Sequence, residues 1–122
     1  MNMKRLTAKE EEVLTYIWQI DAPCAPRDVV ARYPEPRPHV NTVATSFQSL
    51  EAKGYLTHES HGRGYLYRPT VTRLDYGRRT LGDVIQHFFA GSYMSAVSAF
   101  VKDRNVSREE LDALLHELED GQ

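Results

Sequence analysis

The sequence predicts a mainly α-helical protein with one small β-hairpin, and three observations carry this prediction. Apolar residues recur at spacings of three and four over most of the 122 residues, which is the period of amphipathic helices. Two short strand-like runs flank Gly62-Arg63-Gly64, which is the pattern of a hairpin turn. From Val71 onward the pattern is helical only, so we expect one region over residues 1–71 and another over 72–122.

Composition limits the class of protein. Hydrophobic content of 41% and charged content of 26% are ordinary for soluble proteins. No apolar run reaches membrane-spanning length and the first residues lack a signal peptide's apolar core, so we expect a cytoplasmic protein with no membrane segment. The single cysteine, Cys24, excludes an internal disulfide. The net charge of −2 is uneven: residues 1–70 hold nine Lys and Arg against eight Asp and Glu, and residues 71–122 hold six against nine.

Two helices are expected before the first cluster of prolines. Thr7-Ala8-Lys9-Glu10 is a capping box, in which the hydroxyl and the carboxylate each accept from the other residue's backbone N–H. The helix that it begins has the apolar residues Val13, Leu14, Ile17 and Trp18. Pro26 suits the first position of a second, shorter helix, and the prolines from Pro34 to Pro38 then form a stiff connector.

The third helix is expected within Pro38–Tyr55, with Gly54 as its left-handed cap. One stripe should face the core; it comprises Val40, Val43, Phe47 and Leu50. The opposite face is small, polar and almost uncharged; it comprises Asn41, Thr42, Ala44, Thr45, Gln48 and Ser49. Amide side chains can pair with adenine and threonine methyl groups can meet thymine, so this face suits a DNA groove. A short solvated helix surface would give the same pattern.

Residues 55–61 and 65–69 form the two expected strands, with Arg63 at the tip between them. Three helices followed by a hairpin with a basic tip form a winged helix-turn-helix, in which the third helix enters the major groove and the wing contacts the DNA backbone. We therefore expect base contacts from Asn41, Thr42, Ala44, Thr45 and Gln48. We expect backbone contacts from His39, Ser46, His58, Arg63 and Arg68.

Three further amphipathic helices are expected after Val71. Thr72 and Ser92 can cap the first two, Gly91 separates these, and Ser107-Arg108-Glu109-Glu110 is a capping box for the third. Their apolar stripes have little to bury against within one chain, so we expect a homodimer. The residues assigned to dimerisation are Leu81, Val84, Ile85, Phe88, Met94, Val97, Phe100, Leu111, Leu114, Leu115 and Leu118.

Other chemistry has little support in the sequence. His58 and His61 lie three apart on a strand, so they point to opposite faces and cannot share a metal ion. No arrangement of Ser, His and Asp or of Cys and His has supporting local sequence, and Cys24 fits a small packing residue. We therefore expect no enzyme activity, no metal and no cofactor. The alternative to DNA binding is a winged-helix module whose third helix contacts another protein.

The order and spacing of these motifs resemble the BlaI/MecI/CopY family of bacterial repressors. The residues that carry the resemblance are Leu6-Thr7, Glu10, Val13, Trp18, Thr42-Val43, Thr45, Leu50, Lys53-Gly54-Tyr55-Leu56, Gly62-Arg63, Tyr65, Tyr67-Arg68-Pro69, Phe89 and Gly91-Ser92. The resemblance implies a dimeric winged-helix repressor with a helical C-terminal dimerisation region and a palindromic double-stranded DNA operator. In the β-lactam-responsive members it implies release by a membrane-bound sensor metalloprotease, which cuts the repressor ahead of a phenylalanine.

Three positions depart from the family pattern. Residues 114–122 lack the paired cysteines of the copper-responsive branch, which excludes copper sensing by that route. The expected cleavage site carries Ala99-Phe100, where the family typically has Asn-Phe. His39 and Val40 replace the Ser or Asp expected ahead of the third helix, so we expect a less well capped helix start.

Overall fold

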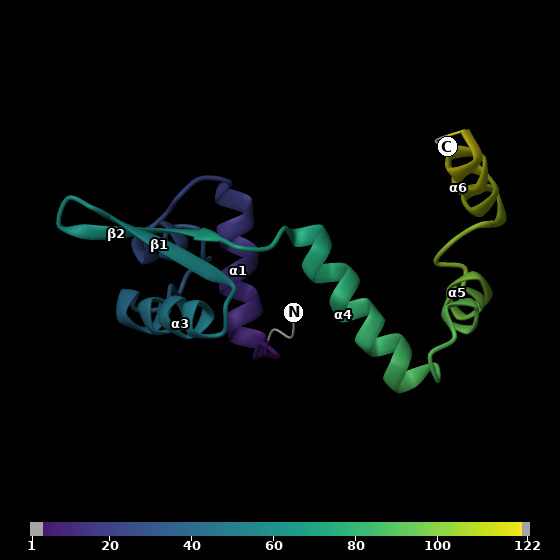
Figure 1. Cartoon of the computed structure of the whole chain (residues 1–122), viewed down its shortest axis with the longest axis horizontal. Coiled ribbons are helices and arrows are strands. Elements are labelled where there is room, and N and C mark those ends of the chain that lie inside the picture. The colour runs from purple at the N-terminus through teal and green to yellow at the C-terminus, as the bar shows by residue number, and fades with distance from the viewer. Residues whose placement is uncertain (1–3, 121–122) are drawn as a thin grey trace. The chain divides into compact units, whose positions relative to one another are not determined.

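The computed structural model describes residues 4–120 (Figure 1). Its elements are, in order, α1 (Ala8–Ile20), α2 (Pro26–Val30), α3 (Val40–Ala52), β1 (Leu56–His61), β2 (Gly64–Pro69), α4 (Arg73–Phe88), α5 (Tyr93–Lys102) and α6 (Arg108–Asp120). This mainly helical fold with one antiparallel hairpin confirms the predicted class. The chain divides into two compact units, the first ending at Tyr76 and the second beginning at Gly77. A division of function near residue 71 stays a prediction.

The predicted starts of α1 and α2 are confirmed. The Thr7 hydroxyl accepts from the Glu10 N–H at 3.1 Å, and the Glu10 carboxylate accepts from the Thr7 N–H at 2.7 Å. Pro26 is the first residue of α2, and the Asp28 carboxylate accepts from the Ala25 N–H at 2.8 Å. These local hydrogen bonds satisfy donors that have no partner inside a helix, so they fix where each helix begins.

The core of the first unit lies between α1, α2, α3 and the hairpin. Its most deeply buried side chains are Val13, Leu14, Ile17, Cys24, Val29, Val43, Phe47 and Leu50. The prediction that Val40 faces this core is wrong, because its side chain is 39% exposed. Val40 is the first residue of α3, and the buried face of the helix begins one turn later, at Val43.

A buried carboxylate joins α1 to α3. Glu10 is 6% exposed, and besides its role in the cap it accepts from the Lys53 ammonium at 2.7 Å and from the Ser49 hydroxyl. Burial by itself raises the pKa of Glu10, but the hydrogen bonds from Lys53, Ser49 and Thr7 outweigh it and lower the pKa from 4.5 to about 2. The start of α1 is thereby held against the C-terminal end of α3.

The base of the hairpin is held by backbone and ring contacts. Cys24 and Tyr67 exchange two backbone hydrogen bonds, with N···O distances of 2.9 and 2.7 Å, which adds a short bridge beside β2. The Tyr67 ring meets the Phe47 ring of α3 edge-on at 5.0 Å between centroids. Cys24 is buried, as expected for a packing residue. The hairpin is therefore attached to both the α1–α2 connection and α3.

The first turn of α4 belongs to the first unit. The Trp18 indole N–H donates to the Val71 carbonyl at 3.0 Å, and the Tyr76 hydroxyl donates to the Glu11 carboxylate. The Tyr76 ring lies 5.8 Å from that of Trp18 and 5.7 Å from that of Tyr55. The packed domain thus extends a few residues beyond the hairpin.

The second unit has little core of its own. Its predicted caps are confirmed, since Ser92 accepts from the Ser95 N–H and Ser107 and Glu110 form a capping box. Within the described part of α4, α5 and α6, however, only Ile85 and Ala96 are buried. No single helix among residues 4–120 is long and apolar enough to cross a membrane; α4 and α5 reach that length only together, with a 91° bend between them.

We expect Glu10→Gln to lower the free energy of unfolding at pH 7 by about 1–3 kcal/mol, because the Lys53 ammonium loses its anionic partner. Since folding lowers the pKa of Glu10 from 4.5 to about 2, the stabilisation is complete above pH 4.5 and disappears as the pH falls towards 2. Denaturant titrations at steps between these values should therefore show the variant and the wild type converging. Glu35→Gln, at an exposed acid, is the matched control. Equal stability of the Glu10 variant and wild type at pH 7 would contradict this account.

Candidate nucleic-acid interface

The exposed face of α3 is uncharged and offers groups that are free to bind. Asn41, Thr42, Thr45 and Gln48 are exposed, and Ala44 is half-buried between them; we call these five residues the α3 surface. Within residues 4–120, the side-chain amides of Asn41 and Gln48 have no hydrogen-bond partner. The Thr45 hydroxyl donates to the Asn41 carbonyl at 3.0 Å, so its methyl group is its main outward feature.

The start of α3 is capped, contrary to the prediction from His39. The imidazole Nδ1 of His39 accepts from the Asn41 N–H at 3.0 Å. The His39 side chain therefore caps the helix in place of the expected Ser or Asp. Because Nδ1 accepts, a neutral ring carries its proton on Nε2. His39 is exposed, so it places this N–H beside the open N-terminus of the helix, where anions bind well.

Two serines of α3 point away from the exposed face. Ser49, which helical period placed on that face, is half-buried and donates to Glu10; that prediction is wrong. Ser46 is 6% exposed, so it lies in the interior and not on the α3 surface. Small polar residues can lie on either face of a helix, and here the buried carboxylate of Glu10 draws Ser49 inward.

The wing turns through two residues, Gly62 and Arg63. His61 pairs with Gly64 across the strands, and Gly62 has a φ of +63°, a left-handed value that favours glycine in hairpin turns. Arg63 is exposed at the tip. Arg68 lies 3.4 Å from Glu59 in a solvent-exposed ion pair, an interaction of small energy that DNA phosphate can replace.

His58 faces α3. Its Nδ1 lies 2.5 Å from a Glu51 carboxylate oxygen, and its ring packs against the rings of Tyr65 and Tyr67 at 4.5 and 5.3 Å between centroids. No local sequence pattern indicates this contact, because the two residues belong to different elements. Within residues 4–120, no group of His, Cys, Asp and Glu is arranged to hold a metal ion.

The second unit exposes an apolar surface of its own. The exposed members of the set assigned to dimerisation are Leu81, Val84, Phe88, Met94, Val97, Phe100, Leu114, Leu115 and Leu118, and we call them the tail surface. Leu111 is half-buried. Ile85 is 3% exposed, so its side chain packs within its own chain and is not part of the tail surface. Ala99 is half-buried and Phe100 exposed, and both lie inside α5.

Comparison with known proteins shows which family the chain resembles. Residues 6–120 match the family described as penicillinase repressor, so the match includes both the α3 surface and the tail surface. The chain is 30% identical over 79 residues to the penicillinase repressor of Bacillus licheniformis, an alignment that covers 65% of this chain and 62% of that protein. The chain thus spans less than two thirds of the length of that relative. With nearly its whole length matched, the chain belongs to the penicillinase repressor family.

Proposed function

We propose that the protein is a sequence-specific DNA-binding repressor that acts as a homodimer on a palindromic operator. The observation that carries this proposal is the α3 surface, whose uncharged side chains are exposed on a helix beside a basic wing tip. An ordinary solvated helix would expose Lys and Glu there, and such a helix would not approach base edges closely. Membership of a repressor family supports the same conclusion.

Each part of the interface has a distinct role in this proposal. Amides such as those of Asn41 and Gln48 can form paired hydrogen bonds with adenine, and the methyl groups of Thr42 and Thr45 fit against thymine methyls. The short Ala44 side chain lets the helix approach the bases. The backbone contacts come from His39 at the helix start and from Arg63 and Arg68 on the wing, and they set the position of α3 in the groove.

The tail surface supports the assembly part of the proposal. It exposes large apolar side chains on all three helices of the second unit, and a second copy offers an identical surface to cover it. Linking two half-site contacts in this way raises the apparent affinity by roughly 10²–10⁴ without any new contact. A protein that cannot dimerise should therefore no longer bind the operator tightly.

We propose that the Ala99–Phe100 bond is where this assembly is opened by proteolysis. The family resemblance implies a membrane-bound sensor metalloprotease that cuts ahead of a phenylalanine, and Phe100 occupies that position. Because both residues lie within α5, a protease reaches the bond only when that helix opens locally. The half-buried Ala99 in place of the usual Asn makes the bond a slower substrate in this proposal.

The proposal as a whole is tested by selection from a pool of random DNA duplexes. The full-length protein is incubated with the pool at about 150 mM salt, and the bound duplexes are sequenced over several rounds. We expect enrichment of an inverted repeat whose half-sites lie about one helical turn apart. If folded protein enriches no sequence, the protein-interaction alternative replaces DNA binding.

If α3 reads bases, two α3 variants should lose affinity for the selected duplex but not for unrelated DNA. Asn41→Ala and Gln48→Ala should each cost about 1–3 kcal/mol at the selected duplex and little on unrelated duplexes. Arg63→Ala should instead weaken all duplexes alike and reduce the salt slope by about one per protein copy. Fluorescence anisotropy measures these affinities, with Gln19→Ala on α1 as the control amide. Unchanged discrimination in the double variant of Asn41 and Gln48 would exclude this mode of readout.

Cleavage within α5 should abolish both dimerisation and operator binding. A site for a specific protease is inserted between Ala99 and Phe100, and the uncut variant serves as its own control by dimerising and binding first. After complete cleavage, sedimentation should show monomers, and the affinity for the duplex should fall by about 10²-fold or more. Circular dichroism should show that the first unit remains folded. Dimers that keep full affinity after cleavage would exclude this bond as the switch.

A further inference from the structure

Within residues 4–120, one side-chain hydrogen bond joins the strands of the wing to α3, the one between His58 and Glu51. Along β1 only Leu56 is buried, and along β2 only Tyr67. His58 lies opposite Tyr67 in the strand register, packs with its ring tilted against those of Tyr65 and Tyr67, and reaches Glu51 in the last turn of α3. The two side chains are 35% and 31% exposed, so water only partly screens their interaction. We call this the Glu51–His58 contact.

The chemistry of this contact argues against a direct role for His58 at a phosphate. A carboxylate only accepts hydrogen bonds, so the Nδ1 facing Glu51 carries the ring proton. With Nδ1 engaged by Glu51 and the ring packed against Tyr65 and Tyr67, the side chain is turned toward α3 and not outward along the wing. His58 is therefore better suited to joining the wing to α3 than to touching DNA.

We propose that the Glu51–His58 contact is a positioning element that holds the wing at the angle to α3 required for both to engage one duplex. His58 is separated from the Gly62 turn by about 13 Å of strand, so a small rotation of the hairpin about its attachment at Tyr67 moves Arg63 by several ångströms. Glu51 and His58 thus act on DNA through the wing. This inference rests on the proposed function, because it assigns the contact a role in DNA binding.

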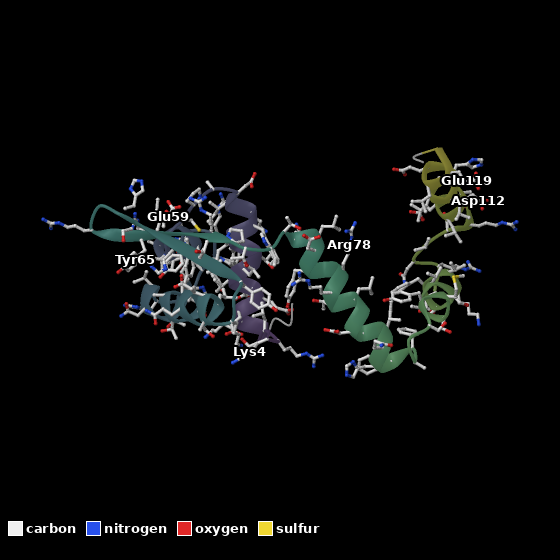
Figure 2. The ribbon with its side chains drawn as sticks, viewed as in Figure 1. Lys4, Glu59, Tyr65, Arg78, Asp112 and Glu119 are labelled. Atoms are coloured by element: carbon white, nitrogen blue, oxygen red, sulfur yellow. The ribbon has the colours of Figure 1, made fainter. Side chains whose placement is uncertain are left out.

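The sign of the effect separates positioning from simple electrostatics. Removing an acid beside DNA reduces repulsion, so by charge alone any neutral variant of Glu51 should bind more tightly. Positioning predicts the reverse for a variant that cannot accept from His58. Glu59 supplies the matched comparison, because it is an acid on the neighbouring residue of the same strand but on the opposite face, away from Tyr65 (Figure 2).

The first experiment compares Glu51→Ala, Glu51→Gln, Glu59→Ala and Glu59→Gln on the selected duplex. The two Glu51 variants lose the same charge, but glutamine keeps a carbonyl oxygen that can accept from His58 Nδ1. We expect Glu51→Ala to bind about tenfold more weakly than wild type, and Glu51→Gln to bind at least as tightly as wild type. The two Glu59 variants both remove the weak, solvent-exposed ion pair with Arg68, so they should bind alike. Equal effects of Glu51→Ala and Glu51→Gln, in either direction, would overturn the proposal.

The second experiment needs no DNA. Spin labels are placed at Gln48→Cys on α3 and Arg63→Cys at the wing tip of the full-length protein, and their distance distribution is measured by pulsed electron resonance. The native Cys24 stays unlabelled, since burial, together with the charge of Asp28, raises the pKa of its thiol to about 11. With Glu51→Ala the distance distribution should be broader than in the labelled parent protein. With Glu51→Gln it should be as narrow as in the parent.

The two experiments fail independently. If the wild type selects no duplex, the proposed function is wrong, and the distance distributions alone decide whether Glu51 holds the wing. A distribution that Glu51→Ala leaves unchanged overturns the positioning role even where the wild type binds its operator tightly.

Discussion

The buried carboxylate of Glu10 is the interaction on which the arrangement of the first unit depends. One side chain completes the cap of α1, accepts from Ser49 and Lys53 of α3, and remains charged while 6% exposed. A buried charge requires hydrogen bonds from every available direction, and here they come from two helices distant in sequence. The rotation of α3 about its own axis is thereby restricted. This restriction helps to determine which side chains of α3 face the solvent.

The two units use opposite surface chemistry. The first buries most of its large apolar side chains and exposes small polar groups on α3, whereas the second exposes leucine, phenylalanine and methionine on three helices. Polar groups distinguish partners by the direction of hydrogen bonds, and apolar groups associate with little directional demand. In the proposed role, reading of DNA and assembly are therefore separate properties of one chain, and a single cut can remove one while leaving the other's domain folded.

Signals confined to a few neighbouring residues predicted most of the fold. The capping boxes at Thr7 and Ser107, the proline at the start of α2 and the glycines around Arg63 each act over three or four residues, and each appears as expected. The candidate site was less predictable, because its decisive contacts join distant elements. Helical period places Ser49 towards the edge of the polar face but does not indicate that it turns inward to Glu10, and nothing near His58 indicates Glu51 as its partner. His39 was misjudged because capping statistics favour hydroxyl and carboxylate groups over imidazole.

The uncharged α3 surface has a consequence for how the protein would find its target within a genome. Affinity for arbitrary DNA comes mainly from neutralising phosphates, and this chain has a net charge of −2. In the proposed role such a molecule dwells only briefly on unrelated sequence, so most copies stay free in solution and search by repeated collision more than by long sliding. Few copies are then lost to the excess of competing sites, and a small pool of repressor can keep one operator occupied.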